Sequence, residues 1–335
     1  MSDTVLVTGV GGYIGQHCAA ELLREGFRVR GSVRNAGRTE PIRAAIARVA
    51  PVDRLDFVAL DLLADAGWEA AMEGCRYALH VASPYAMVDE RQASALIEPA
   101  LHGTKRALTA ARNAGVERVV VTSSVVAMNG HMTRGTFGPD DWTDLEAPGL
   151  NPYVRSKTLA ERAAWDHARA HPDGPEVVAI NPGATYGPTL TGDADGQSLK
   201  WVAAMLRGKV PVLGRFSFTM VDVRDVARLH LRAMTKPEAS GQRYVAASRE
   251  PVPFVRIAEI LKSNGFGKVS TRTVPDFVVR GMGLIDRDVR GLVDFLGKDV
   301  GSDPSATVRD LEWSPTPLET TVLDMAESLR TVVEA

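Results

Sequence analysis

The sequence predicts an α/β fold: a doubly wound parallel sheet with a smaller, mostly helical C-terminal lobe. Short apolar runs rich in β-branched residues alternate with longer helical runs over most of the chain, as in parallel sheets covered by helices. The first run, 4–8, ends in glycines and leads directly into a helical segment. The chain has 335 residues, 45% of them hydrophobic, which is enough for one large α/β domain plus a smaller lobe.

Seven segments are predicted to be the strands of the sheet. Each is short, continuous and apolar, as expected for a strand that is buried on both faces. In chain order the strands are expected at 4–8, 27–33, 55–60, 76–82, 116–122, 176–180 and 242–246. The helices are expected at 16–24, about 40–50, 96–114, from 153 through the apolar run 159–165, 199–206 and 226–234. Prolines punctuate a mostly helical remainder.

Glycines follow the first predicted strand at intervals of three. Gly9, Gly12 and Gly15 form the pattern Gly-x-x-Gly-x-x-Gly between a strand and a helix. Glycines at such a turn let backbone N–H groups approach a pyrophosphate, which then lies at the N-terminus of the helix. A glycine turn can also simply end a strand, but this context favours a dinucleotide site. The neighbouring residues expected at the same site are Thr8, Tyr13 and Ile14.

Tyr153 and Lys157 stand four residues apart at the head of the apolar run 159–165, so a helix places both side chains on one face. A phenol with an ordinary pKa of about 10 transfers protons poorly near neutrality, and a nearby ammonium favours the phenolate. The pair therefore predicts a general acid/base. Alone, such a pair is more often a half-buried aromatic residue and a solvated charge, but the glycine turn and a serine upstream favour an enzyme.

Ser124 follows the fifth predicted strand. A hydroxyl at the carboxyl end of a strand faces the crevice where ligands bind in open α/β sheets. We therefore expect Ser124 to donate a hydrogen bond to a substrate carbonyl. A long loop rich in Gly, Pro and Asp separates it from Tyr153, and loops of that length usually indicate function.

The end of the second predicted strand is where the adenosine ribose of a dinucleotide is sensed. The residue there is Arg34, followed by Arg38, in place of an acid. A guanidinium suits a 2′-phosphate through charge-assisted hydrogen bonds, so NADP(H) is predicted over NAD. The alternative is that both arginines are surface charges. Asp61 and Leu62, after the third strand, are expected near the adenine.

Together these residues resemble the extended short-chain dehydrogenase/reductase family. Within it, the segments 32–34, 80–84, 141–145 and 153–165 resemble the branch of dihydroflavonol reductases, cinnamoyl-CoA reductases and NADPH carbonyl reductases. The resemblance implies a Rossmann domain, a catalytic triad of Ser124, Tyr153 and Lys157, and contact of Lys157 with the nicotinamide ribose. The further cofactor contacts expected are Val81, Ala82, Ser83, Thr122, Asn181 and Pro182.

The expected division places a dinucleotide-binding domain, including the catalytic helix, in residues 1–190, with parts of about 218–247 added to it. Residues 191–335 are expected to form mainly a substrate-binding lobe that is interleaved with this domain. The substrate is expected to be a ketone or aldehyde with an apolar or aromatic body. The residues expected to contact it are Tyr85, Met128, Asn129, Trp142 and Tyr186, with Met87, His131, Phe216 and Phe218 as further candidates. These aromatic residues can equally belong to the core.

The net charge of -2 leaves no polybasic surface, so neither nucleic acid nor an anionic membrane is an expected partner. The two cysteines, Cys18 and Cys75, suggest neither a disulfide framework nor a metal site. His80, within an apolar strand, is expected to be packed rather than catalytic. A cytoplasmic protein is expected, because no targeting or spanning segment is recognised. A homodimer is compatible with the sequence.

Two other functions remain as alternatives. An NAD-dependent sugar-nucleotide epimerase or dehydratase would use the same fold and triad, but Arg34 opposes NAD, and Val125 and Val126 stand where similar dehydratases carry an Asp-Glu pair. A non-catalytic dinucleotide-sensing module would keep the glycine turn, although such modules usually lack the Tyr/Lys pair. Flavonoid specificity is not implied, since 125–128 departs from the small-residue run of dihydroflavonol reductases.

Overall fold

The structure, a computed structural model, describes residues 3–84, 92–285, 289, 293, 295–330 and 333 of the chain. Seven parallel strands form the main sheet of this part in the order β11-β7-β5-β4-β1-β2-β3. Their bounds are β1 Thr4–Thr8, β2 Arg28–Val33, β3 Leu55–Ala59, β4 Tyr77–His80, β5 Arg118–Thr122, β7 Glu176–Pro182 and β11 Arg243–Ala246. Each coincides with a predicted strand, and the order reverses at β1 as in doubly wound sheets. The predicted fold class is confirmed.

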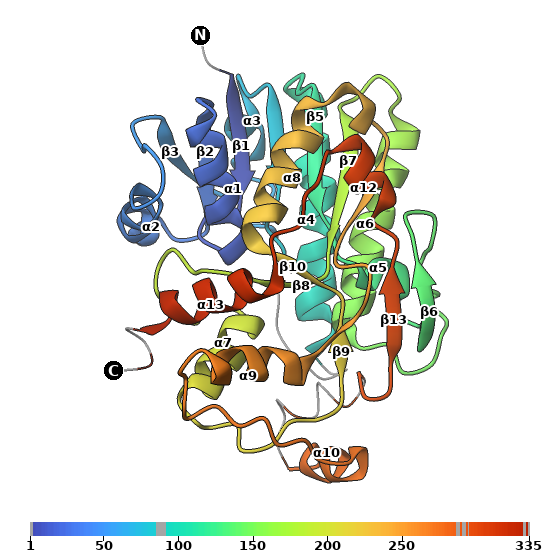
Figure 1. The fold of residues 1–335 in the computed structure, drawn as a ribbon. Coiled ribbons are helices and arrows are strands. Elements are labelled where there is room, and N and C mark those ends of the chain that lie inside the picture. Colours follow the sequence, from blue (N-terminus) through green and yellow to red (C-terminus); the bar gives the residue numbers. More distant parts are fainter. Residues whose placement is uncertain are drawn as a thin grey trace.

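Helices cover both faces of the sheet (Figure 1). One face carries α1 (Tyr13–Arg24), α2 (Thr39–Ala47) and α8 (Val223–Thr235), with α1 and α8 side by side. The other face carries α3 (Trp68–Met72), α4 (Ser94–Asn113) and α6 (Pro152–Ala170), with α4 packed along α6. This two-sided cover explains why the strands read as continuous apolar runs rather than alternating ones.

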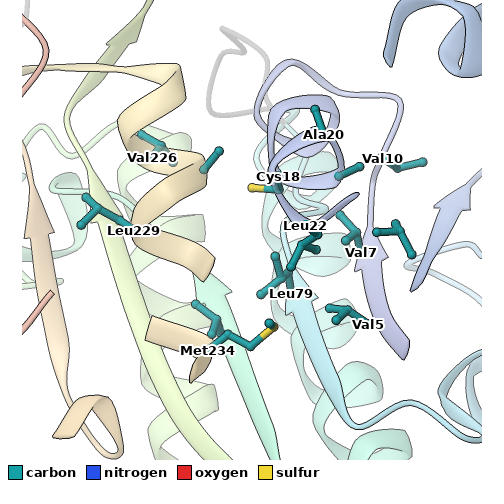
Figure 2. Close-up of a cluster of buried hydrophobic side chains, with 14 of the residues drawn as sticks. Val5, Val7, Val10, Cys18, Ala20, Leu22, Leu79, Val226, Leu229 and Met234 are labelled. Carbon is teal, nitrogen blue, oxygen red and sulfur yellow. The ribbon is translucent and has the colours of Figure 1, made fainter. Parts of the chain in front are cut away.

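The alternation of side chains along β1 divides the core into two layers. Val5 and Val7 lie on the side of α1 and α8 and share one hydrophobic cluster with Leu22 and Leu229 (Figure 2). Leu6, between them, belongs to the cluster on the opposite face with α4. All of these side chains are buried, and full burial of a Val or Leu contributes about 1.5–3 kcal/mol relative to exposure.

A lobe of helices lies at one edge of the sheet, at the bottom of Figure 1. Its helices are α7 (Gln197–Leu206), α9 (Phe254–Ser263), α10 (Asp276–Met282) and α13 (Leu318–Ser328). They surround a separate hydrophobic cluster that includes Phe216 and Leu261. The short antiparallel pair β9 (Ser217–Phe218) and β12 (Val252–Pro253) lies among them, and β8 (Ala184–Tyr186) pairs in parallel with β10 (Met220–Asp222).

The division of the chain at residue 190 stays a prediction. After that residue the chain returns to the sheet through α8 and β11, and again through α12 (Ser305–Asp310). Thr307 of α12 donates a hydrogen bond from its hydroxyl to the carbonyl oxygen of Val245 in β11, at 2.8 Å. Lobe and sheet therefore alternate along the second half of the sequence.

The segment between β5 and α6, which is expected to be a loop, contains α5 (Val126–Asn129) and β6 (Arg134–Phe137). β6 pairs in parallel with β13 (Asp299–Ser302), a strand from the far end of the chain. The expectation of a loop is therefore wrong for this part. Its sequence of glycine and polar residues becomes a strand only because a distant segment completes its backbone hydrogen bonds.

An arginine ties the sheet to the end of α8. Arg118 begins β5, is 6% exposed, and its Nη1 donates to the carbonyl oxygens of Ala233, Met234 and Lys236 at 3.0, 3.1 and 2.6 Å. Its Nε also donates to Glu176, at 2.7 Å. The last carbonyls of a helix have no partner within it, and a cation there also interacts favourably with the helix dipole.

Replacing Arg118 by Met should lower the free energy of unfolding by about 2–4 kcal/mol, because each buried polar group left unpaired costs roughly 1–3 kcal/mol. Urea denaturation followed by circular dichroism measures the loss. Arg76→Met is the matched control: Arg76 precedes the neighbouring strand and pairs with Asp3 and Glu117, but its side chain is 45% exposed, so its loss should matter much less. Equal losses in the two variants would contradict the assigned role.

Candidate active site

A cleft of about 1390 Å³ lies between the carboxyl edge of the sheet and the lobe. The glycine turn after β1, the ends of β2 to β5 and the first turn of α6 form one side of it, and α7, β9 and α9 contribute to the other. Ligands of open α/β sheets bind in this position. Every predicted cofactor contact except Asn181 lines the cleft, and their contact with a cofactor stays a prediction.

The glycine turn has the shape that a pyrophosphate requires. Gly9 has a φ of +67°, and a Cβ atom on Gly15 would lie 2.3 Å from the carbonyl oxygen of Gly9, so the turn closes only with glycine at 15. Gly12 caps α1 without a side-chain acceptor for the first N–H groups. Those groups face an open cradle at the N-terminus of a helix, which fits the phosphates of a dinucleotide.

Buried polar groups line the cleft beside this turn. The hydroxyl of Thr8 lies 3.1 Å from Nδ1 of His80 and accepts a hydrogen bond from the backbone N–H of Ala82 at 3.0 Å. Burial, with a smaller effect from Lys157, lowers the pKa of His80 to about 4, so the ring is neutral and packed, as expected. The Oγ atom of Ser83 is buried without a hydrogen-bond partner among the described residues, which leaves a donor for a bound ligand.

The end of β2 presents two exposed guanidinium groups to the cleft. Arg34 follows the strand directly, and Arg38 lies in the turn that precedes α2. Both line the cleft on the side of the glycine turn, together with Asp61 and Leu62 from the end of β3. This is the edge at which a 2′-phosphate on an adenosine ribose would meet positive charge.

Tyr153 lies in the first turn of α6. The helix begins there because Asn151 accepts a hydrogen bond from the N–H of Val154 at 3.0 Å, and Pro152 occupies the first helical position. Burial raises the pKa of Tyr153, while a hydrogen bond with Ser124 acts in the opposite sense. The net shift is therefore opposite to the predicted lowering, and the part that lowers this pKa comes from Ser124 rather than from Lys157. A protonated phenol at neutral pH can act as a proton donor.

Lys157 completes the predicted triad. It is 7% exposed, and its Nζ donates to the carbonyl oxygen of Thr122 at 3.2 Å, at the end of the strand that carries Ser124. Burial lowers its pKa to about 8, and the carboxylate of Glu161 acts in the opposite sense. Ser124, Tyr153 and Lys157 thus all line the cleft, and Tyr153 is hydrogen-bonded with Ser124.

Five expected contacts among the described residues do not line the cleft: Met128, Trp142 and Asn181, and also His131 and Phe216. Met128 is fully buried in a hydrophobic cluster with Phe137, so it has no surface for a substrate. Trp142 lies against the guanidinium of Arg243, 3.7 Å from the ring centroid, and is not in the cleft lining. Asn181 is also fully buried, behind the triad. Met128 and Asn181 pack inward, whereas Trp142 is half-buried against the Arg243 guanidinium.

The remaining substrate candidates divide between cleft and elsewhere. Asn129, Tyr186 and Phe218 line the cleft, whereas His131 and Phe216 do not. Tyr85 and Met87 lie outside the described residues. Three aromatic residues that were not predicted from the sequence also line the cleft: Trp201, Phe254 and Phe295. They lie on lobe segments that carry no local motif, so no sequence signal marked them.

Neither a metal centre nor a membrane span is found in the described part of the chain. Among its residues there is no group of three or more His, Cys, Asp or Glu that could hold a metal ion. Within the same residues, every helix is too short or too polar to cross a bilayer.

Comparisons with known proteins relate the chain to one family. A family model described as the NAD dependent epimerase/dehydratase family matches residues 5–247. Cinnamoyl-CoA reductase 2 of Arabidopsis thaliana is 37% identical over 249 residues, which cover 72% of this chain and 72% of that protein.

Two solved structures share the fold. Yeast methylglyoxal/isovaleraldehyde reductase Gre2 complexed with NADPH has a TM-score of 0.79 at 24% identity and covers 98% of both chains. MoeE5 in complex with UDP-glucose and NAD has a TM-score of 0.76 at 21% identity and covers 99% of this chain and 100% of its own. At these identities the likeness shows the fold alone.

Replacing Arg34 by Ala should reduce the affinity for NADPH at least tenfold and leave that for NADH nearly unchanged. A charged hydrogen bond contributes roughly 1.5–3 kcal/mol, and 1.4 kcal/mol corresponds to a factor of ten. Fluorescence titration with each dinucleotide measures both affinities. Arg28→Ala, at the opposite end of the same strand, is the control and should alter neither. Unchanged discrimination in the Arg34 variant would remove this residue from the cofactor site.

Proposed function

The chain belongs to the NAD dependent epimerase/dehydratase family, and from this premise we propose that it is an NADPH-dependent reductase of ketones or aldehydes with an apolar or aromatic body. The observation that carries the proposal is the meeting of the glycine cradle with hydrogen-bonded Tyr153 and Ser124 in one cleft. The sequence motifs resemble the cinnamoyl-CoA reductase branch. The similarity to the Arabidopsis cinnamoyl-CoA reductase confirms this resemblance.

The residues of the chain divide the reaction between them. When bound, NADPH supplies the hydride that reduces the carbonyl carbon. Tyr153 donates its proton to the carbonyl oxygen, and Ser124 hydrogen-bonds the same oxygen where negative charge develops. The Lys157 ammonium stabilises the phenolate that remains, because an opposite charge favours the ionised form. The products are the alcohol, the oxidised dinucleotide and a tyrosinate that takes its proton back from solvent.

The substrate side of the cleft supports an apolar or aromatic body. Phe218 lies 5.0 Å from Phe295 and 6.4 Å from Phe254 between ring centroids, and all three rings line the cleft with Trp201. A group of aromatic rings in a cleft wall favours flat, apolar ligands. The name of the plant relative, a cinnamoyl-CoA reductase, fits an aromatic substrate.

The two alternatives make different use of the same cleft. A sugar-nucleotide epimerase or dehydratase holds NAD and returns the hydride, and the fold shared with MoeE5 is compatible with it. Arg34 at the ribose edge and the valines after Ser124 favour the reductase instead. A dinucleotide-sensing module would bind the cofactor without turnover, and the hydrogen-bonded Tyr153 opposes that function.

Incubating the pure protein with NADPH and a panel of carbonyl compounds, followed at 340 nm, separates these functions. We expect oxidation of NADPH with aryl or branched alkyl aldehydes and ketones, and little with nucleotide sugars. Retained NAD with turnover of nucleotide sugars would support the epimerase or dehydratase. Binding of NADPH without turnover of any compound would support the sensing module and contradict the proposal.

Tyr153→Phe should lower kcat at least about 100-fold, the effect typical of acid/base groups, and leave NADPH affinity nearly unchanged. Turnover is measured where chemistry limits the rate, and affinity by NADPH fluorescence. Tyr77→Phe, which removes a hydroxyl at the opposite end of β4 from the cleft, is the matched control and should keep wild-type activity. A Tyr153 variant that binds NADPH normally and keeps more than a tenth of wild-type kcat would exclude Tyr153 as the acid.

A further inference from the structure

A buried carboxylate stands directly behind the triad. Glu161 lies one helical turn after Lys157 on α6, is 1% exposed, and does not line the cleft. Its Oε2 accepts hydrogen bonds from the hydroxyl of Ser123 and from Nδ2 of Asn181, the latter at 2.7 Å. Its Oε1 accepts from Nε of Arg243 at 2.6 Å. A buried carboxylate is costly unless it is paired and hydrogen-bonded, so this set of partners requires a reason.

The contacts of Glu161 hold the strand end that carries Ser124. Ser123 precedes Ser124 in the chain, and Asn181, while donating to Glu161, also donates to the carbonyl oxygen of Ser124 at 3.1 Å. The backbone on both sides of the Ser124 side chain is thus attached to one carboxylate. A displacement of about 1 Å in a group that contacts the substrate can lower the reaction rate about 100-fold. The hydrogen bonds that hold the backbone at Ser124 should therefore affect the rate.

The same carboxylate acts on the charge of Lys157. The two residues stand four apart on α6, and with His80 and Ser123 they line a small second pocket that shares Lys157 with the cleft. Burial disfavours the ammonium, and Glu161 offsets part of that effect. His80 from β4 and His230 from α8 are buried, and their pKa values are lowered to about 4, so neither ring carries a charge near neutral pH.

Two other ionisable groups lie close by. Arg243 from β11 is the partner of Glu161, with side chains 9% and 0% exposed, and Tyr153 is protonated near neutrality. The Arg243 guanidinium also donates to the carbonyl oxygens of Pro139 and Asp141, at 2.6 and 2.8 Å. Arg243 therefore fixes the position of the carboxylate from the side of the molecule away from the cleft.

We propose that Glu161 is a positioning residue for the reaction: its carboxylate fixes the strand end that carries Ser124 and gives the buried Lys157 ammonium a negative neighbour. Its effect on turnover rests on the proposed function, whereas its effect on Lys157 does not. The ion pair with Arg243 holds the carboxylate in place. Removing the charge should therefore make Lys157 lose its proton at lower pH and leave less ammonium near neutrality.

The test compares Glu161→Gln/Arg243→Met with Arg243→Met. The double variant removes the negative charge without leaving a buried guanidinium unpaired, which would destabilise the Glu161→Gln variant alone. NMR titration of 13C-labelled lysine, with Lys157 assigned by its absence in Lys157→Met, measures the midpoint directly. We expect the midpoint in the double variant to lie at least about one pH unit below that in Arg243→Met, which keeps the carboxylate.

Glu161→Asp keeps the negative charge but changes the position of the carboxylate. It provides a second test if the double variant does not fold. Its carboxylate is one methylene shorter, so the Lys157 midpoint should stay close to the wild type while kcat falls and the KM for NADPH changes little. In the double variant, the basic limb of kcat should move to lower pH together with the NMR midpoint.

Equal Lys157 midpoints in the double variant and in Arg243→Met would overturn the proposal, and so would wild-type kcat in Glu161→Asp. Because the titration needs no substrate, a wild-type protein without carbonyl reduction would contradict the proposed function and leave the NMR result to decide on Glu161.

Discussion

The parallel register of β1, β4 and β5 is the constraint on which the active site depends. Thr8 at the end of β1 is level with His80 at the end of β4, and His80 is level with Val121 near the end of β5. The loops that follow these strands therefore open at one edge of the sheet. The glycine turn, the Ser83 hydroxyl and Ser124 come from separate parts of the chain and meet only because these strands end together.

Burial sets the electrostatics of this edge, and it acts on both titratable members of the triad in the same sense. It raises the pKa of Tyr153 and lowers that of Lys157, which favours the neutral form of each. The hydrogen bond from Ser124 to the phenol and the carboxylate of Glu161 each offset part of this effect. The charge states of Tyr153 and Lys157 thus each depend on a neighbouring group, Ser124 and Glu161 respectively.

Much of the fold, and the position of Ser124, Tyr153 and Lys157 in one cleft, could be predicted from the sequence because the signals are local. A buried parallel strand needs a continuous apolar run, and the turn between β1 and α1 closes only with glycine at position 15. Other features depend on partners far along the chain. β6 pairs with β13, and Met128 packs inward near β6. Arg243 on β11 donates a hydrogen bond to Glu161 on α6. A polar or apolar side chain alone does not show which of these partners it will meet.

Isotope transfer shows whether hydride passes from NADPH to a carbonyl carbon in this cleft. The protein is incubated with NADPH deuterated at C4 of the nicotinamide, on either face in separate reactions, and with an aldehyde or ketone. Mass spectrometry and NMR then locate the label in the alcohol. We expect one deuterium on the carbinol carbon when one face of the nicotinamide is labelled and none when the other face is labelled. Alcohol formed without deuterium from either face, or label found only in a cofactor that returns to its reduced form, would contradict this expectation.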